Sequence, residues 1–154
     1  PTTTDNGYTT VCLVAHSLGC ALALQAAELC SPSALVLVAP FVSLSEVAYD
    51  HYGAVGRCVC PNRLNNATAA QHMRMPVLLM HGMRDEVVPP RHSSQLFEQL
   101  SYCSRRERCL VPAEAHALTS TWAMRIGQAV CNFTPQRAAS LGPFVESSNK
   151  LTLE

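Results

Sequence analysis

Short apolar runs alternate with helix-forming stretches along most of this 154-residue chain. The apolar runs have the length and the β-branched content of strands that are covered on both faces, and they occupy residues 9–15, 34–39, 76–81 and 108–111. Segments rich in strong helix formers lie between or after these runs, at residues 20–30, 91–100 and 118–131. We therefore expect an α/β fold, in which a mostly parallel sheet of about four strands is flanked by helices.

The stretch from residue 41 to residue 72 breaks this regular pattern. It contains Gly53, Gly56, a proline and two adjacent asparagines, which predict short helices and loops. Its position between two strands is a natural place for a cap over a site. We expect residues 1–133 to form one partial domain with 41–72 as its cap-like region. From residue 134 to residue 154 the periodicity fades, and this segment is predicted to be a loosely ordered tail.

Composition and charge exclude several functional classes. With 48% apolar and 14% charged residues, the chain is globular in character and not disordered. Eleven basic and eleven acidic residues cancel, so net charge gives no reason to expect a nucleic-acid partner. No run of about 18 apolar residues is present, so no membrane span is expected within the chain. The first residues also lack the charged and apolar regions of a signal peptide.

Five of the eight cysteines fall inside apolar segments, and we expect them to be reduced core thiols: Cys12, Cys20, Cys30, Cys109 and Cys131. There is neither a Cys-x-x-Cys motif nor a Cys/His cluster at zinc spacing, so no metal site is predicted. Reduced thiols favour a cytoplasmic location or membrane association on the cytosolic side. Two Asn-x-Thr patterns leave a secretory route open.

The first candidate for chemistry lies where the first predicted strand meets the first predicted helix. Residues 15–19 read Ala-His-Ser-Leu-Gly, with small residues two positions on either side of Ser17. This pattern, at a strand-to-helix junction, is typical of a nucleophile elbow that lifts the serine hydroxyl above the strand ends. The backbone N–H of Leu18 would then be one oxyanion donor at the start of the helix. On the pentapeptide alone, an ordinary helix cap by Ser17 fits nearly as well.

A serine nucleophile needs a base, and the base needs an orienting carboxylate. Asp85 is one of only three aspartates in the chain, and it follows the third predicted strand. His116 follows the fourth predicted strand. The carboxyl ends of parallel strands share one edge of a sheet, so both side chains are expected near Ser17. The chain order of serine, aspartate and histidine fits the same interpretation.

Other polar residues fit this chemistry less well. His16 is expected to pack, because a sharp turn directs the side chain beside the serine elsewhere. His81 is expected to be a structural histidine at a strand end. Asp50 follows the second predicted strand by about ten residues and remains an alternative acid. Solvated or structural roles are expected for His51, His72 and His92, and loop-supporting roles for Glu86 and Glu114.

Residues 75–90, which read Met-Pro-Val-Leu-Leu-Met-His-Gly-Met-Arg-Asp-Glu-Val-Val-Pro-Pro, resemble the strand and acid segment of the eukaryotic α/β-hydrolase-domain proteins. This superfamily includes serine-aminopeptidase-like hydrolases, membrane-anchored members and palmitoyl-protein thioesterases, and the resemblance extends to about residue 133. It implies Ser17 as nucleophile, Asp85 as acid and His116 as base. It also implies hydrolysis of an ester, thioester or amide in a small-molecule or acylated substrate, without metal or organic cofactor.

The resemblance also implies that strands normally present before the nucleophile are missing here. The chain is therefore expected to be the C-terminal part of an α/β-hydrolase, with the second oxyanion donor and any membrane anchor lying upstream. Losing one such donor typically slows catalysis by a factor of about 10²–10³, so the isolated chain is expected to be nearly inactive. The alternative function is a non-catalytic scaffold or an inactive fragment that retains the fold.

Overall fold

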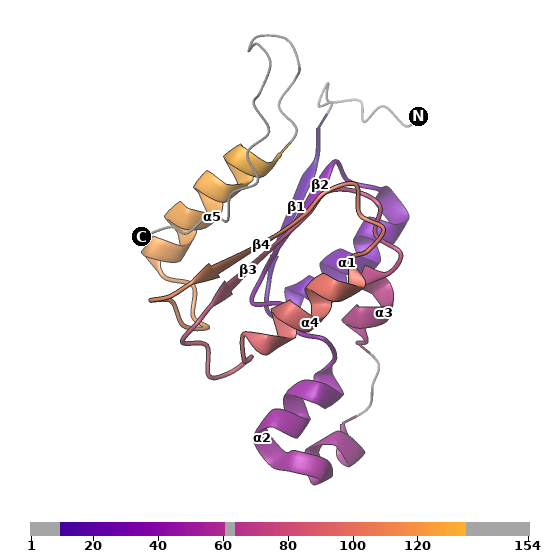
Figure 1. The fold of residues 1–154 in the computed structure, drawn as a ribbon, viewed down its shortest axis with the longest axis vertical. Coiled ribbons are helices and arrows are strands. Elements are labelled where there is room, and N and C mark those ends of the chain that lie inside the picture. Colours follow the sequence, from indigo (N-terminus) through magenta and orange to yellow (C-terminus); the bar gives the residue numbers. More distant parts are fainter. Residues whose placement is uncertain (1–9, 61–63, 135–154) are drawn as a thin grey trace.

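The computed structural model describes residues 10–60 and 64–134 of the chain (Figure 1). A parallel sheet runs through the middle, with helices on both of its faces. This arrangement confirms the predicted α/β class. Apart from Thr134, the predicted C-terminal tail lies outside the described residues.

The four strands are hydrogen-bonded in the order in which they occur along the chain: β1 (Cys12–His16), β2 (Ala34–Val38), β3 (Val77–Gly82) and β4 (Arg106–Val111). All three neighbouring pairs are parallel. Every residue of the two central strands is buried, as their unbroken apolar runs predict. The strand β4 begins two residues earlier than expected, because an edge strand tolerates charged side chains.

Helices cover the sheet unequally (Figure 1). On one face lie α1 (Gly19–Cys30), α3 (Asn66–Ala70) and α4 (Arg91–Gln99). Among the described helices, α5 (Ser120–Phe133) is the one that covers the other face. The helices predicted at 20–30, 91–100 and 118–131 are thereby confirmed within two residues at each end. None of the described helices combines the length and the apolar character needed to cross a bilayer.

Alternation along β2 creates two apolar cores. Successive side chains of a strand point to opposite faces of the sheet. Leu35 and Leu37 therefore pack in the core under α1, α3 and α4, while Val36 packs with Trp122 and Phe133 under α5. The two cores fix the sheet rigidly between its helices, and every predicted site residue lies at the carboxyl end of a strand of that sheet or in the loop that follows it.

The region predicted to contain short helices and loops consists mainly of α2 (Leu44–Val59), which projects from one end of the molecule (Figure 1). Gly53 has φ +63° and ψ −149°, which interrupts the helical backbone and divides α2 into two helical segments. Gly56 then packs closely against the backbone of Ala48 in the first segment, where a Cβ atom would lie 2.8 Å from the Ala48 carbonyl carbon. The two glycines thus let α2 fold back on itself.

The prediction of five core thiols is only partly confirmed. Cys20 and Cys109 are buried, and burial raises the pKa of the Cys20 thiol to about 12. Cys12 is half-buried. For Cys30 and Cys131 the prediction was wrong, because both lie on outward-facing positions of α1 and α5 and are exposed. Apolar neighbours in the sequence did not reveal which side of each helix faces the sheet.

Candidate active site

Ser17 lies in the turn that joins β1 directly to α1. Its φ of +52° is in the left-handed region that a non-glycine residue rarely adopts, which is a local strain typical of functional turns. A hydrogen bond of 2.9 Å from the Ser17 backbone N–H to the Val38 carbonyl continues the pairing of β1 with β2 up to this turn. The N-cap of α1 is Leu18, without a side-chain hydrogen bond, so the alternative in which Ser17 caps the helix was wrong.

Small residues flank this turn, as the pentapeptide pattern suggested. A Cβ atom placed on Gly19 would lie 3.9 Å from the Cβ atom of Ala15, which is an ordinary van der Waals contact. Among the described residues, no backbone carbonyl accepts a hydrogen bond from the Leu18 N–H. It lies at the start of a twelve-residue helix, where the helix dipole favours negative charge. The turn therefore offers an available donor beside Ser17.

Asp85 lies in the loop after β3, 5% exposed, and both of its carboxylate oxygens are engaged. Oδ1 accepts hydrogen bonds from the backbone N–H groups of Val87 and Val88, at 3.0 and 2.8 Å. Oδ2 accepts one from Nδ1 of His116 at 2.8 Å. Burial alone would raise the pKa of Asp85, but contacts with His81, the Val88 N–H and His116 outweigh it and hold the pKa below its usual value. The carboxylate is therefore ionised at neutral pH.

His116 lies in the loop between β4 and α5. Because the Asp85 carboxylate only accepts, Nδ1 of the imidazole carries the proton and Nε2 is left as the acceptor in the neutral ring. This is the tautomer that a general base for a serine hydroxyl requires. The Asp85 and His116 loops are also joined by their backbones, since the Arg84 N–H donates to the Glu114 carbonyl at 3.0 Å.

The structure thus brings Asp85 and His116 together, as predicted, and places Ser17 at the same edge of the sheet. No hydrogen bond joins the Ser17 hydroxyl to the His116 imidazole in the part of the chain that the structure describes. The link between the two sides of the site is His16, whose Nε2 lies 2.9 Å from the His116 carbonyl oxygen. The rings of these two histidines are 5.0 Å apart between centroids.

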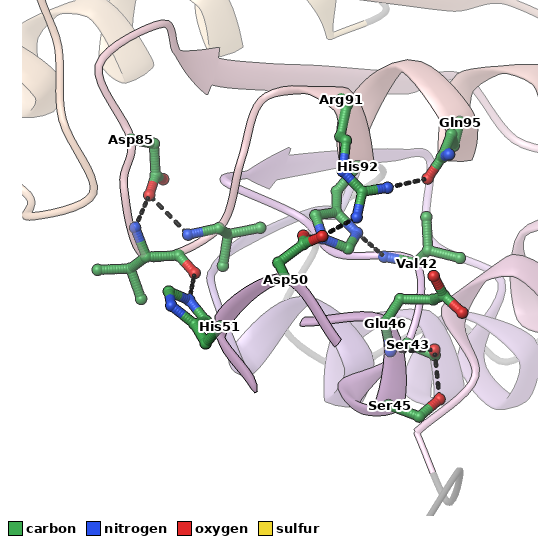
Figure 2. A network of polar contacts seen from close by, with 12 residues as sticks. Val42, Ser43, Ser45, Glu46, Asp50, His51, Asp85, Arg91, His92 and Gln95 are labelled. Atoms are coloured by element: carbon green, nitrogen blue, oxygen red, sulfur yellow. Dashed lines mark hydrogen bonds and ion pairs between the residues drawn. The ribbon is translucent and has the colours of Figure 1, made fainter. Parts of the chain in front are cut away.

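Asp50, the alternative acid, is occupied elsewhere. Figure 2 shows Asp50 of α2 turned toward Arg91 and His92 at the start of α4. It forms an ion pair with Arg91, and its Oδ2 accepts from Nε2 of His92 at 2.8 Å. Nδ1 of His92 accepts a hydrogen bond from the Val42 N–H, so the ring is held on both sides. Asp50 and His92 therefore form a structural link between α2 and α4.

The remaining polar candidates have structural contacts. Next to Asp50, His51 donates from Nε2 to the Val87 carbonyl at 2.8 Å, and this attaches α2 to the acid loop. His72 is exposed and contacts Glu28. Glu114 accepts a hydrogen bond from the Thr119 hydroxyl, which agrees with its expected loop-supporting role. Among residues 10–60 and 64–134, no group of three or more His, Cys, Asp or Glu side chains is placed to hold a metal ion.

Two features of the site were not found by sequence reasoning. Gly82 ends β3 directly beneath the loop that carries His116, and a Cβ atom there would lie 2.7 Å from the Glu114 carbonyl carbon and 3.0 Å from the Ala115 oxygen. His81 contacts Asp85 across the intervening turn, with Nε2 3.5 Å from Oδ2. The spacing His81-Gly82-x-x-Asp85 was the available signal, but spacing alone does not show which loop packs above the glycine.

Comparison with known proteins identifies the family and the fold of the chain. The sequence matches the serine hydrolase family over residues 2–116, a stretch that contains Ser17, Asp85 and His116. No curated protein sequence matches the chain. Among solved structures, it is similar to an esterase from Pyrococcus furiosus, with a TM-score of 0.64 and 15% sequence identity over 82% of this chain and 55% of the other.

Two further solved structures share the fold. A Pyrococcus horikoshii acylaminoacyl peptidase has a TM-score of 0.64 at 12% identity, covering 85% of this chain and 25% of the other. An α/β-hydrolase enzyme from a sediment metagenome of the Mar Chica lagoon, Morocco, has a TM-score of 0.59 at 20% identity, covering 82% and 61%. The chain thus spans less than two thirds of the length of these proteins. By its family match and its architecture, the chain belongs to the serine hydrolase family and has the α/β-hydrolase fold.

Proposed function

We propose that this protein hydrolyses an ester or thioester through Ser17, His116 and Asp85. The single observation that carries the proposal is the 2.8 Å hydrogen bond between His116 Nδ1 and Asp85 Oδ2. This pair lies at the edge of the sheet where Ser17 occupies a strained strand-to-helix turn. A carboxylate that fixes a histidine tautomer beside a strained serine is the arrangement that nucleophilic acyl transfer needs.

The proposed reaction begins when Nε2 of His116 takes the proton of the Ser17 hydroxyl as Ser17 Oγ attacks the substrate carbonyl carbon. Catalytic hydrogen bonds are often formed only when substrate is bound. In the proposed reaction, the Ser17 side chain therefore turns about its Cα–Cβ bond toward Nε2 in the substrate complex. His116 then returns the proton to the leaving alcohol or thiol. The acyl group stays on Ser17 Oγ until His116 takes a proton from water and the water oxygen attacks the acyl carbon. The imidazolium then returns this proton to Ser17 Oγ as its bond to the acyl carbon breaks, which releases the carboxylic acid and restores the serine.

Two groups stabilise the charges that develop along this path. The N–H of Leu18 at the start of α1 donates to the oxyanion of the tetrahedral intermediate. Asp85 keeps a negative charge beside the imidazolium that forms on His116, because its hydrogen bonds lower its pKa although burial opposes this. Asp85 itself keeps its charge throughout, so its role is electrostatic and orienting.

The substrate class follows from the leaving groups that this chemistry accepts. Esterases are named among the structural neighbours, and so is an acylaminoacyl peptidase. An ester or thioester is the better proposal, because an alcohol or a thiol is a better leaving group than an amine. Amide hydrolysis is the alternative within the same mechanism.

A fluorophosphonate probe tests the proposal, because it phosphorylates a serine that an adjacent base activates. The probe is applied to the protein as its own cells express it, and the labelled peptide is identified by mass spectrometry. Labelling is expected at Ser17 and is lost in Ser17→Ala. Ser31→Ala is the matched control, because Ser31 is an exposed serine that also has a positive φ, of 45°, at the opposite end of α1. An unlabelled Ser17 in the unmodified protein would reject the proposal and favour a non-catalytic scaffold.

A further inference from the structure

His81 is a fully buried histidine that the proposed mechanism leaves without a task. It is the last residue but one of β3, with 0% of its surface exposed. Its Nε2 lies 2.8 Å from the Val88 carbonyl oxygen and 3.5 Å from Oδ2 of Asp85. A carbonyl only accepts hydrogen bonds, so Nε2 carries a proton. One N–H group therefore faces both the carboxylate of Asp85 and the Val88 carbonyl at the end of its turn.

The other ring nitrogen argues against a simple packing role. Nδ1 of His81 is buried without a hydrogen-bond partner in the described part of the chain. A buried polar atom without a partner costs stability that an apolar side chain of similar size, such as leucine, would not cost. The ring is thus placed at a cost on one side while its Nε2–H makes useful contacts on the other.

We propose that His81 is a positioning residue for Asp85. Its Nε2–H holds Oδ2 of Asp85 and the Val88 carbonyl in place at the same time. Oδ1 of Asp85 already accepts from Val87 and Val88. With His81 in place, the turn from residue 82 to residue 88 is closed from both sides, and the carboxylate keeps one orientation toward His116. The contact between His81 and Asp85 is a property of the fold. The proposal rests on the proposed function only where it says that this orientation of Asp85 serves catalysis.

The electrostatic surroundings agree with this role. Burial raises the pKa of Asp85. Of the contacts that lower this pKa, the one with His81 has the largest effect, followed by the Val88 N–H and His116. Removing the His81 donor is therefore expected to raise the pKa of Asp85. Any pH measurement must take into account the other titratable and charged groups around this turn. They are His16 on β1, His51 on α2, Arg84 and Glu86 in the turn itself, His92 on α4, and Glu114 and His116 after β4.

Three substitutions separate positioning from packing. His81→Leu keeps approximate volume and loses the donor. His81→Gln restores an N–H at about the distance of Nε2, whereas the shorter amide of His81→Asn does not reach it. The titration of the Asp85 carboxyl group is followed by carbon-13 NMR. We expect the midpoint to rise by about half a pH unit in His81→Leu and in His81→Asn, and to return toward the original value in His81→Gln.

Several outcomes would overturn the proposal. An Asp85 midpoint that is equal in all variants, or a rise that His81→Gln fails to reverse, would make His81 a packing residue. If His81→Leu does not fold, the comparison of His81→Asn with His81→Gln decides in the same way. The titration needs no turnover, so an unlabelled Ser17 would reject the proposed function while leaving this result readable.

Discussion

His16 donates a hydrogen bond from Nε2 to the backbone carbonyl of His116, over 2.9 Å. The residue directly before the proposed nucleophile therefore holds the loop of the proposed base. Burial lowers the pKa of His16, so its ring is mainly neutral near pH 7 and puts little positive charge beside His116. The packing role expected from the sequence is thus more specific in the structure, because the contact joins the end of β1 to the loop after β4.

The His16 contact gives the first prediction. His16→Phe keeps an aromatic ring but removes the donor, and we expect kcat/KM to fall by about tenfold, the equivalent of one lost hydrogen bond of ordinary strength. His16→Gln keeps a donor and is expected to retain most of the activity. Initial rates with a chromogenic short-chain ester give the measurement. Equal rates for His16→Phe and the unsubstituted protein would mean that the His116 loop is held without this bond.

Asp85→Asn tests the proposed acid with little change of shape. The asparagine oxygen can still accept from Val87 and Val88, so its amide N–H₂ group faces His116 and favours the wrong tautomer. We expect kcat to fall by about 10⁴-fold, the effect that this substitution has in serine proteases. Steady-state kinetics measures it, and Asp50→Asn is the control. A large loss in Asp50→Asn with a small one in Asp85→Asn would reverse the assignment of the acid.

Gly82→Ala tests how tightly the loops that carry Asp85 and His116 are packed together. The added Cβ atom would lie 2.7 Å from the Glu114 carbonyl carbon, and backbone atoms cannot move aside as a side chain does. We expect a loss of about 3 kcal/mol in the free energy of unfolding, at the upper end for overpacking.

Gly127→Ala is the matched control for this measurement. The residue is inside α5, and apart from its own helix backbone no atom of the described residues lies within 4 Å of a Cβ placed there. We expect this substitution to stabilise the protein by about 0.5–1 kcal/mol, because alanine is the better helix former. Urea denaturation of both variants gives the two values. Similar effects at both positions would show that the Glu114 loop moves freely over β3.

The buried His92 predicts how stability changes with pH. Burial lowers its pKa, so between pH 6.5 and the folded-state pKa the unfolded chain binds a proton that the folded chain resists. The free energy of unfolding should therefore decrease as the pH falls below about 6.5, and this contribution should level off below the folded-state pKa. Urea denaturation between pH 8 and pH 4 measures the slope. His92→Gln should flatten the slope in the upper part of this range. The pKa of His16 is also lowered, and so are those of Asp50 and Asp85, which contribute at the acid end.

Apolar periodicity predicted the elements of this fold well, because both cores are built from local patterns. The unbroken runs in β2 and β3 reflect burial on two faces, and the helix formers between them mark α1 and α4. The positions of Asp85 and His116 followed from the same reasoning, since each comes just after a strand that the pattern located.

Contacts between loops were not predictable in this way. The fit of Gly82 under Glu114 depends on the distance between β3 and β4, which no local pattern contains. The exposure of Cys30 and Cys131 depends on the rotation of α1 and α5 against the sheet. The break in α2 at Gly53 shows the same limit, because a glycine indicates a possible bend but not its direction.

The four strands in the described part of the chain run in one direction, so the loops that follow them lie at a single edge of the sheet, the rim above the two apolar cores. Exposed positions in those loops, such as Met83 and Val87, can be substituted at little cost in stability. If the proposed hydrolysis is correct, selection for a new substrate can therefore act on these exposed rim positions while the scaffold stays unchanged. The tight fit at Gly82 sets the boundary of that freedom, because there the rim and the scaffold share atoms in contact.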